Sequence, residues 1–254
     1  MKNCYLVTSL IEADNTFLLK KNQIRSILTT EDRFFDTIKT IDCIVENDSE
    51  AKIFLLDASK EYFEELIIKY PNLHYIHIEK TNPNLANNIR THPSKSHGES
   101  LMILDFLKQY KNIIASEYDY LIKLSGRYYF VGNYLNDLNE KNINKFLFKK
   151  PVFWNKKDLT YLSEEYLPTE MYIGDKLGGY YTVINAIGNT QLNKYEIAMF
   201  ACASMTDTYS KYFYVDIEYL LYKIFSDFEF KNNVIETNWT VEGRGGQNGK
   251  YFRF

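Results

Sequence analysis

The residues best suited to chemistry lie in the stretch Tyr118–Phe130, where an apolar run leads into a Ser-Gly turn between two cations. Lys123 stands within the run, and Ser125, Gly126 and Arg127 follow it. Open α/β sheets bind ligands at the carboxyl ends of their strands, and both an arginine fork and a lysine charge suit a phosphate. A glycine there permits a close backbone approach or a positive φ. The stretch therefore indicates an anion site, with two solvated surface cations as the equally simple alternative.

Polar residues at the ends of two earlier apolar runs could complete such a site. Thr8 and Ser9 close the first run, where hydroxyls can hydrogen-bond a base or ribose, or simply form a turn. Arg25 and Arg33 lie in the next segment and could meet a diphosphate or be solvated. Asp57 closes the second run, where a carboxylate can bind ribose hydroxyls or serve the helix that follows.

Three carboxylates could serve an acceptor. Glu99 follows a glycine at a helix start, where an acid is favoured by the helix dipole, although it could also face a sugar hydroxyl. Asp216 and Glu218 are two residues apart, so they lie on different faces of a helix and only one can face a cleft. A general base needs one carboxylate, so either is a candidate, and a capped helix start is the structural alternative.

Other motifs give weaker signals. His92 and His97 flank Lys95, but their spacing is no recognised metal pattern and no acidic pair accompanies them, which favours non-metal roles. The Gly-rich segment around Arg244 is not a P-loop, although it could fold over a bound anion. The sequence has no hydrolase, zincin or dinucleotide-binding fingerprint.

Composition sets the remaining limits. The 254 residues are 45% hydrophobic and 25% charged, which fits one globular domain with a sizeable core. A net charge of -3 gives no electrostatic case for nucleic acid. Three separated cysteines argue against a disulfide framework and favour the reducing cytoplasm. The sequence shows no signal-peptide pattern and no long apolar span, which leaves peripheral contact with the inner membrane open.

Strands are expected to alternate with helices, as in an α/β sheet with right-handed crossovers. Apolar runs predict strands at 5–10, 52–57, 74–78, 118–124, 145–148 and 180–184. Apolar periodicity and caps predict helices from Thr30 onward and at 60–69 after Ser59, 99–110, 190–203 and 214–226. Residues 81–97 are expected to form a long polar loop, and residues 240–254 a flexible closing segment.

These pieces together resemble a known group of proteins. The matching residues are, in order, Tyr5-Leu6-Val7-Thr8-Ser9, Ile24-Arg25-Ser26, Thr30-Glu31-Asp32-Arg33-Phe34 with Thr37, Thr40 and Ile41, Asp57-x-Ser59, Gly98-Glu99, and Ile122-Lys123-Leu124-Ser125-Gly126-Arg127-Tyr128. The order resembles small glycosyltransferase-like proteins of bacterial surface-polysaccharide loci and some large viruses. The resemblance covers residues 1–135 well and the rest loosely. It implies an α/β, GT-A-like single domain with a mostly parallel central sheet flanked by helices.

The resemblance also implies a donor-binding half and an acceptor-binding half, and this chain departs from the family at the metal-binding motif. Residues 1–135 would bind the nucleotide sugar, and residues 136–254 would form the acceptor side. GT-A enzymes usually carry Asp-x-Asp at the end of a strand, where the acids hold Mg²⁺ or Mn²⁺ on the diphosphate. Here that strand ends in Ser125-Gly126-Arg127. Lys123 and Arg127 could stabilise the leaving charge instead, so no cofactor is predicted and divalent metals are not favoured.

The predicted function is transfer of a sugar from a nucleotide sugar to a hydroxyl of a capsule- or lipopolysaccharide-type glycan in the cytoplasm. The predicted donor-binding residues are Thr8, Ser9, Arg25, Arg33, Asp57, Lys123, Ser125, Gly126 and Arg127. The predicted acceptor-binding residues are Glu99 and Tyr128. The predicted catalytic residues are Arg127 and, as the base, Glu218 or Asp216. Tyr128, Trp154 or Trp239 could stack on sugar rings or belong to the core. Alternatives are a sialyltransferase-like metal-independent transferase and a nucleotide- or glycan-binding protein without turnover.

Overall fold

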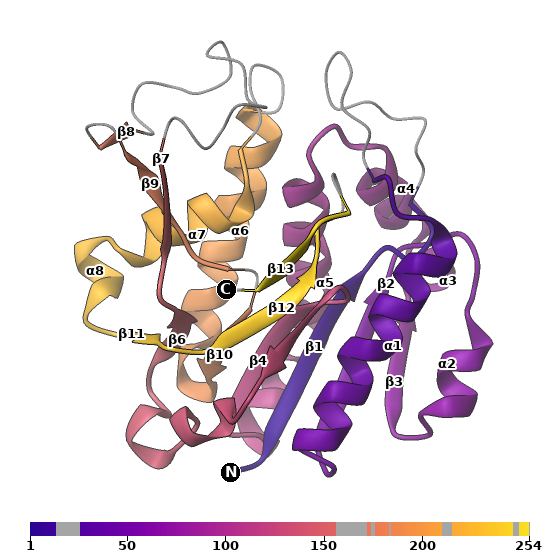
Figure 1. Cartoon of the computed structure of the whole chain (residues 1–254), viewed down its shortest axis with the longest axis horizontal. Coiled ribbons are helices and arrows are strands. Elements are labelled where there is room, and N and C mark those ends of the chain that lie inside the picture. Colours follow the sequence, from indigo (N-terminus) through magenta and orange to yellow (C-terminus); the bar gives the residue numbers. More distant parts are fainter. Residues whose placement is uncertain are drawn as a thin grey trace.

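The computed structural model describes residues 1–13, 26–155, 172–173, 176–182, 184–209, 215–245 and 249–253. Its centre is a seven-stranded sheet in the order β11-β6-β10-β4-β1-β2-β3 (Figure 1). The strands are β1 (Asn3–Ser9), β2 (Lys52–Asp57), β3 (Leu73–His77), β4 (Tyr120–Ser125), β6 (Phe146–Lys149), β10 (Asn185–Gly188) and β11 (Val234–Thr237). β1 pairs in parallel with β2 and β4, whereas β10 runs antiparallel to β4 and β6.

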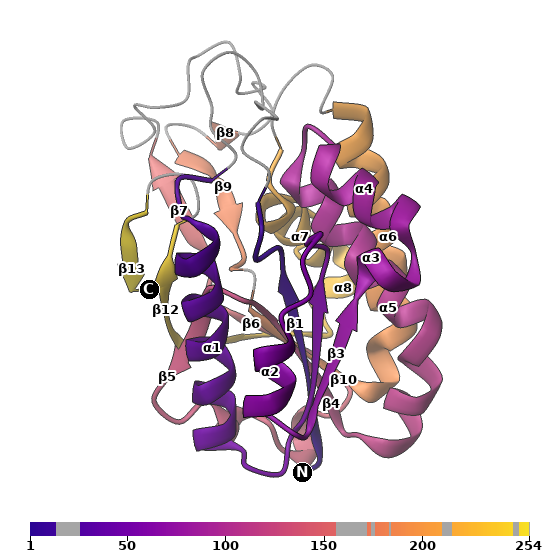
Figure 2. The same cartoon turned by 90° about the vertical axis from the view of Figure 1, so that its right-hand side faces the viewer.

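Helices cover both faces of this sheet (Figure 2). Tyr5 and Val7 of β1 pack in one core cluster with α1 (Thr30–Asn47) and α2 (Glu64–Lys69). Cys4 and Leu6 point to the other face and pack in a second cluster with the remaining large helices. Those helices are α4 (Pro83–Thr91), α5 (Lys95–Glu117), α6 (Leu192–Tyr209) and α7 (Ile217–Phe225). A strand buried on both faces explains why β1 reads as an apolar run without alternation.

Two smaller sheets and several short helices complete the described chain. One sheet joins β13 (Tyr251–Arg253), β12 (Thr240–Arg244) and β5 (Tyr128–Val131), and the other joins β7 (Val152–Asn155), β9 (Lys176–Tyr180) and β8 (Tyr172–Ile173). The short helices are α3 (Ile78–Thr81), η1 (Tyr134–Asp137), η2 (Glu140–Asn142), η6 (Asn189–Gln191) and α8 (Phe228–Lys231). No helix in the described ranges is long and apolar enough to cross a membrane.

The closing segment differs from its prediction. We expected residues 240–254 to be flexible because of their glycines, but β12 and β13 are strands, and β12 pairs with β5. A Cβ on Gly243 would lie 2.2 Å from the carbonyl oxygen of Arg127, so this glycine allows the two backbones to touch. The glycines mark a close backbone approach here rather than a loose end.

The polar loop predicted at 81–97 is wrong. Asn82 caps α4 by accepting from the backbone N–H of Leu85, and Pro83 occupies the first turn, where a missing N–H costs nothing. Ala86 and Ile89 then bury one face of the helix. The composition of the segment concealed a helix because its polar residues are caps and exposed positions.

Other boundaries moved for similar reasons. Thr29, rather than Thr30, caps α1 in a reciprocal capping box with Asp32. Ser59 does not cap α2, which begins at Glu64, because its hydroxyl bonds Asp57 instead. α5 begins at Lys95, four residues earlier than predicted. The strand predicted at 180–184 is wrong, because Tyr180 ends β9 and β10 begins at Asn185.

Candidate functional site

A pocket opens at the carboxyl ends of β1 and β4, which are neighbours in the sheet. Its lining residues are Thr8, Ser9, Leu10, Ala13, Ser26, Arg33, Ile89, Lys95, Glu99, Met102, Ser125, Gly126 and Arg127. The register pairs Thr8 with Ser125, so two of the predicted donor residues lie side by side. The ends of parallel strands and the start of α5 therefore meet here, as in ligand sites of other α/β sheets.

A buried ion pair joins the lining residue Glu99 to Lys123 of β4. Lys123 is 2% exposed, and its Nζ donates to Oε1 of Glu99. The hydroxyl of Thr8 donates to the same oxygen at 3.0 Å. Burial acts to raise the pKa of Glu99, but the charge and hydrogen bond of Lys123 outweigh it and hold that pKa below its usual value. Glu99 is therefore an anion whose nearest countercharge is Lys123.

The Ser-Gly turn after β4 needs its glycine for space. A Cβ on Gly126 would lie 3.0 Å from the hydroxyl oxygens of both Ser9 and Thr37. The backbone N–H of Gly126 donates to the carbonyl of Thr8 at 2.8 Å, which fixes the turn against β1. Among the described glycines, positive φ belongs to Gly132 and Gly249, so Gly126 serves close approach.

Three cations line the pocket: Arg33, Lys95 and Arg127. Arg127 is half-buried, and its Nη1 donates to the carbonyl oxygen of Arg244 at 2.7 Å. Arg244 itself is held on α1 by ion pairs of 3.0 Å to Asp32 and 2.9 Å to Asp36. The last described strands thus fix the position of the guanidinium that the sequence singled out.

Lys95 is a lining residue that sequence reasoning missed. We noted it only between two histidines in a supposed loop, yet it is the first residue of α5. Ser94 caps this helix by accepting from the backbone N–H of His97 at 3.2 Å. A helix N-terminus favours anions, so the start of α5 adds to the charge of Lys95. The pattern Ser-x-x-His gave the only signal, as a possible N-cap.

The predicted acids lie beside the ion pair. α7 begins after Asp216, and the backbone N–H of Ile217 donates to Ser96 of α5 at 3.0 Å, which joins the two helix starts. Burial, then the charges of Asp216 and Glu99, raise the pKa of Glu218 to about 8. Burial also raises the pKa of Tyr128, with Glu218, Glu99 and Asp216 acting in the same direction. The structure therefore brings all four predicted acceptor-side residues into one electrostatic group.

Two candidates lie elsewhere. Asp57 is fully buried, and its Oδ1 accepts from the backbone N–H of Ile11 at 3.1 Å and the hydroxyl of Ser59 at 2.7 Å. Tyr75 donates to its Oδ2 at 3.0 Å. Trp239 is 5% exposed, and its indole N–H donates to Asp137 at 2.8 Å, so it belongs to the core. Arg25 and the side chain of Trp154 fall outside the described residues.

The donor set at the end of β4 does not suit a Mg²⁺ or Mn²⁺ site of the Asp-x-Asp kind. Hard divalent cations require several oxygen ligands. Glu99 is the one carboxylate among the described lining residues, and the Lys123 ammonium already bonds its Oε1. Arg127 stands where an acid pair would place negative charge.

Comparison with solved structures identifies the fold. Core-mannan synthase A (CmsA/Ktr4) from Aspergillus fumigatus, in its Mn/GDP form, matches with a TM-score of 0.53 and 11% identity over 95% of this chain and 74% of that one. An active-site mutant of LgtC matches with a TM-score of 0.50 and 13% identity over 93% of this chain and 72% of LgtC. Glycosyltransferase GlyE of Streptococcus pneumoniae matches with a TM-score of 0.48 and 12% identity over 93% of this chain and 45% of GlyE. The sequence matches no protein-family model and no curated protein sequence.

The chain therefore has the fold of GT-A-type glycosyltransferases, and the predicted α/β class with a mostly parallel central sheet is confirmed. Identities of 11% and 13% carry the fold and no assignment of residues. Function has to be argued from the site itself.

Proposed function

We propose that this protein transfers a sugar from a nucleotide-sugar donor to a hydroxyl of a glycan. One observation carries the proposal: three cations and the N-terminus of α5 surround a pocket at the carboxyl ends of β1 and β4 in a chain with this fold. That combination suits the diphosphate of a nucleotide sugar, which is doubly anionic and leaves as the sugar departs.

The cations divide the work in a way that differs from our sequence interpretation. Lys123 is already paired with Glu99, so its charge fixes that carboxylate and does not point at a ligand unopposed. Arg127 lines the pocket, and its Nη1 is bonded to the carbonyl oxygen of Arg244. Arg127 would bind the diphosphate, with Arg33 and Lys95 beside it. Thr8 and Ser125 would contact the donor from the strand ends.

Charge stabilisation by these residues would make the transfer metal-independent. A developing negative charge on the leaving diphosphate must be stabilised in the transition state, and fixed cations supply this as a bound metal does elsewhere. Arg127 supplies such a charge from a position fixed by two neighbouring strands.

Glu218 is the proposed acceptor base. Its raised pKa lies near neutrality, where a general base is most effective, and its neighbour Glu99 would orient the acceptor hydroxyl. Tyr128 would pack against the acceptor sugar. The acceptor is proposed to be a surface glycan of the capsule or lipopolysaccharide type, met in the cytoplasm at the membrane face, as the resemblance implies.

The test is a thermal-shift panel of UDP-, GDP-, CMP- and dTDP-sugars, each with EDTA and with Mn²⁺. A ligand that binds only the folded chain raises Tm by mass action. We expect one nucleotide to raise Tm in EDTA, and Arg127→Ala to remove that shift. Arg253→Ala is the matched control, since Arg253 lies on β13 with 67% of its side chain exposed. A shift that requires Mn²⁺ would overturn metal independence and point first to Asp216, whose charge acts on Glu218 beside the ion pair.

A binding protein without turnover is the second candidate. The lining of the pocket favours it, because neither Glu218 nor Asp216 is among the described residues that line it. Hydrolysis of the donor in the absence of acceptor separates the two, since a pure binder releases no free sugar. Release by the wild type but not by Arg127→Ala would support the enzyme.

A further inference from the structure

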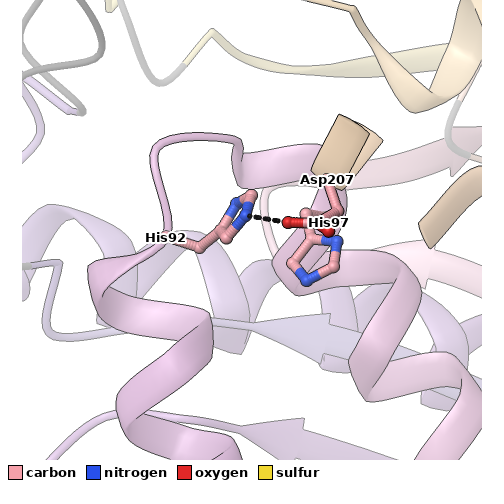
Figure 3. Close-up of side chains that lie close together, drawn as sticks. All are labelled: His92, His97 and Asp207. Carbon is pink, nitrogen blue, oxygen red and sulfur yellow. Dashed lines mark hydrogen bonds and ion pairs between the residues drawn. The ribbon is translucent and has the colours of Figure 1, made fainter. Parts of the chain in front are cut away.

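The α4–α5 connection and the C-terminal end of α6 bring two histidines and a carboxylate together (Figure 3). His92 ends α4, His97 lies in the first turn of α5, and Asp207 lies in the last turn of α6. One ligand atom from each of the three lies within 4.8 Å of the other two. Nε2 of His92 is 3.3 Å from Oδ1 of Asp207, and the ring centroids of His92 and His97 are 4.0 Å apart.

We propose that His92, His97 and Asp207 bind a transition-metal dication, with Zn²⁺ as the best fit. Imidazole nitrogen and carboxylate oxygen are ligands that Zn²⁺ prefers, and three protein ligands plus water complete its tetrahedron. The sequence alone argued against a metal role because it showed two histidines without an acid. The acid comes from a helix that begins at Leu192, so only the fold reveals it.

The surroundings of His97 suit this role, and those of His92 allow it after a change of tautomer. A histidine that binds metal through one nitrogen usually donates its other N–H to a carbonyl or carboxylate. Nδ1 of His97 lies 3.0 Å from the carbonyl oxygen of Ala203, and Nδ1 of His92 lies 3.4 Å from that of Ser94. The backbone N–H of Ser94 donates to Nδ1 of His92 at 3.1 Å, which favours the proton on Nε2. Metal binding through Nε2 would therefore exchange this hydrogen bond for the one from Nδ1–H to the carbonyl oxygen of Ser94.

The helix end and the side-chain exposure add to the argument. The C-terminal end of α6 carries the negative end of the helix dipole, which favours a cation beside Asp207. Zn²⁺ ligands lie at about 2.0–2.2 Å from the ion, so the three atoms must approach more closely than they do now. The Asp207 side chain is 56% exposed, so it can rotate inward without disturbing the core.

A bound Zn²⁺ would clip the end of α6 to the start of α5. That start carries Lys95 and Glu99 into the pocket, so the clip would steady one wall of the site. The inference concerns this wall and needs no assumption about what the pocket binds.

The experiment is equilibrium dialysis of the full chain against Zn²⁺ without any nucleotide, followed by metal analysis and by Tm measured with Zn²⁺ and with EDTA. We expect one Zn²⁺ per chain and a rise in Tm that EDTA reverses. Removing a ligand should cost at least as much as removing an outer-shell partner, so His92→Gln and Asp207→Asn should each weaken binding by about tenfold or more.

His74→Gln is the matched control, because His74 lies on β3 against Tyr110 and should leave Zn²⁺ binding unchanged. Asp207→Asn changes an exposed side chain, so the variant remains folded and its result decides the question. The inference would be overturned if the wild type did not bind Zn²⁺, or if His92→Gln and Asp207→Asn each bound Zn²⁺ as tightly as the wild type. Neither result bears on nucleotide-sugar binding, which is measured separately.

Discussion

The carboxyl ends of β1 and β4 differ sharply from the carboxyl end of β2, although all three place polar residues at one edge of the sheet. At the end of β4, Arg127 lines an open pocket with its Nη1 bonded to a carbonyl. At the end of β2, Asp57 is fully buried and accepts hydrogen bonds from Ile11, Ser59 and Tyr75. A strand end can bind a ligand only where some of its hydrogen-bonding groups are not already bonded within the protein.

The pKa directions support the same contrast. Burial raises the pKa of Asp57 against the opposing effect of its hydrogen bonds, which ties its carboxylate to local structure. The pKa of Glu99 is held low mainly by Lys123 against its own burial. The first carboxylate is held by donors that fix a turn, whereas the second lines the pocket and is held by the charge of the buried Lys123.

Arg127→Ala should produce the largest effect, because it removes the main charge of the open end. Loss of one preorganised donor to a developing oxyanion costs about 10²–10³-fold in rate, so we expect sugar transfer to fall by about that much. Tm should change little. Unchanged transfer in a folded Arg127→Ala variant would remove the contrast between the carboxyl ends of β4 and β2, since the end of β4 would then take no part in the reaction.

Glu218→Gln should lower transfer by about 10²-fold or more, the usual contribution of a general base. The base must be ionised, so wild-type activity should rise as the pH rises through about 8, and the variant should lose that rise. A pH–rate profile measures both. Glu229→Gln on the exposed first turn of α8 is the control, and an unchanged profile in Glu218→Gln would assign the base elsewhere.

The same substitution sharpens the comparison through stability. The folded chain keeps the Glu218 proton up to about pH 8, whereas the unfolded chain releases it near the ordinary value of 4.5. The free energy of unfolding therefore falls as the pH rises through that window. Glu218→Gln should remove this fall, so the variant should gain stability relative to the wild type between pH 5 and pH 8, as urea unfolding at the two pH values would show.

Asp57→Asn, at the carboxyl end of β2, should lower stability and leave donor binding almost unchanged. An amide nitrogen would face groups that now donate to a carboxylate, so the variant should lose about 1–3 kcal/mol of stability. Donor affinity, measured below its Tm, should stay within about twofold, because a lost contact to a charged group would cost far more. A variant that melts like the wild type yet loses donor binding would place Asp57 in the site after all.

Lys95→Ala should have the smallest effect. Lys95 is half-buried at the pocket rim, so its charge is partly screened and its removal should raise the donor KM by about tenfold or less. Lys108→Ala, on the exposed face of the same helix, serves as control. A larger loss for Lys95→Ala than for Arg127→Ala would move the centre of the site to α5.

Five of the seven central strands were predictable because they are written as largely apolar runs, whereas β10 was placed too early in the sequence and β11 was not predicted. β2 matches its predicted range of 52–57, and the helices around it repeat apolar residues at helical spacing. The helix α4 was missed because Asn82 and Pro83 read as loop residues until their place at a helix start is known. Composition could not distinguish a cap from a turn.

The site was predictable only where its residues are neighbours in sequence. The sequence predicted the Ser125–Arg127 turn, but the hydrogen bond from Arg127 to Arg244 joins residues 117 positions apart and depends on strand pairing. The pairing of Lys123 with Glu99 was equally invisible, because each residue had a separate meaning as a phosphate ligand or a sugar ligand. A sequence shows the groups that a site has and conceals which of them are already engaged.

The tie between Arg127 and Arg244 also bears on the order in which the molecule is made. The strands β1, β2 and β4 and the helix α5 are complete once residue 125 has been synthesised, and they could begin to pack during translation. The guanidinium that completes the pocket cannot be fixed until β12 has been synthesised and has paired with β5. A ribosome-bound chain that stops just before residue 240 would therefore contain every strand of the central sheet and every lining residue of the pocket, but not the strand that fixes Arg127.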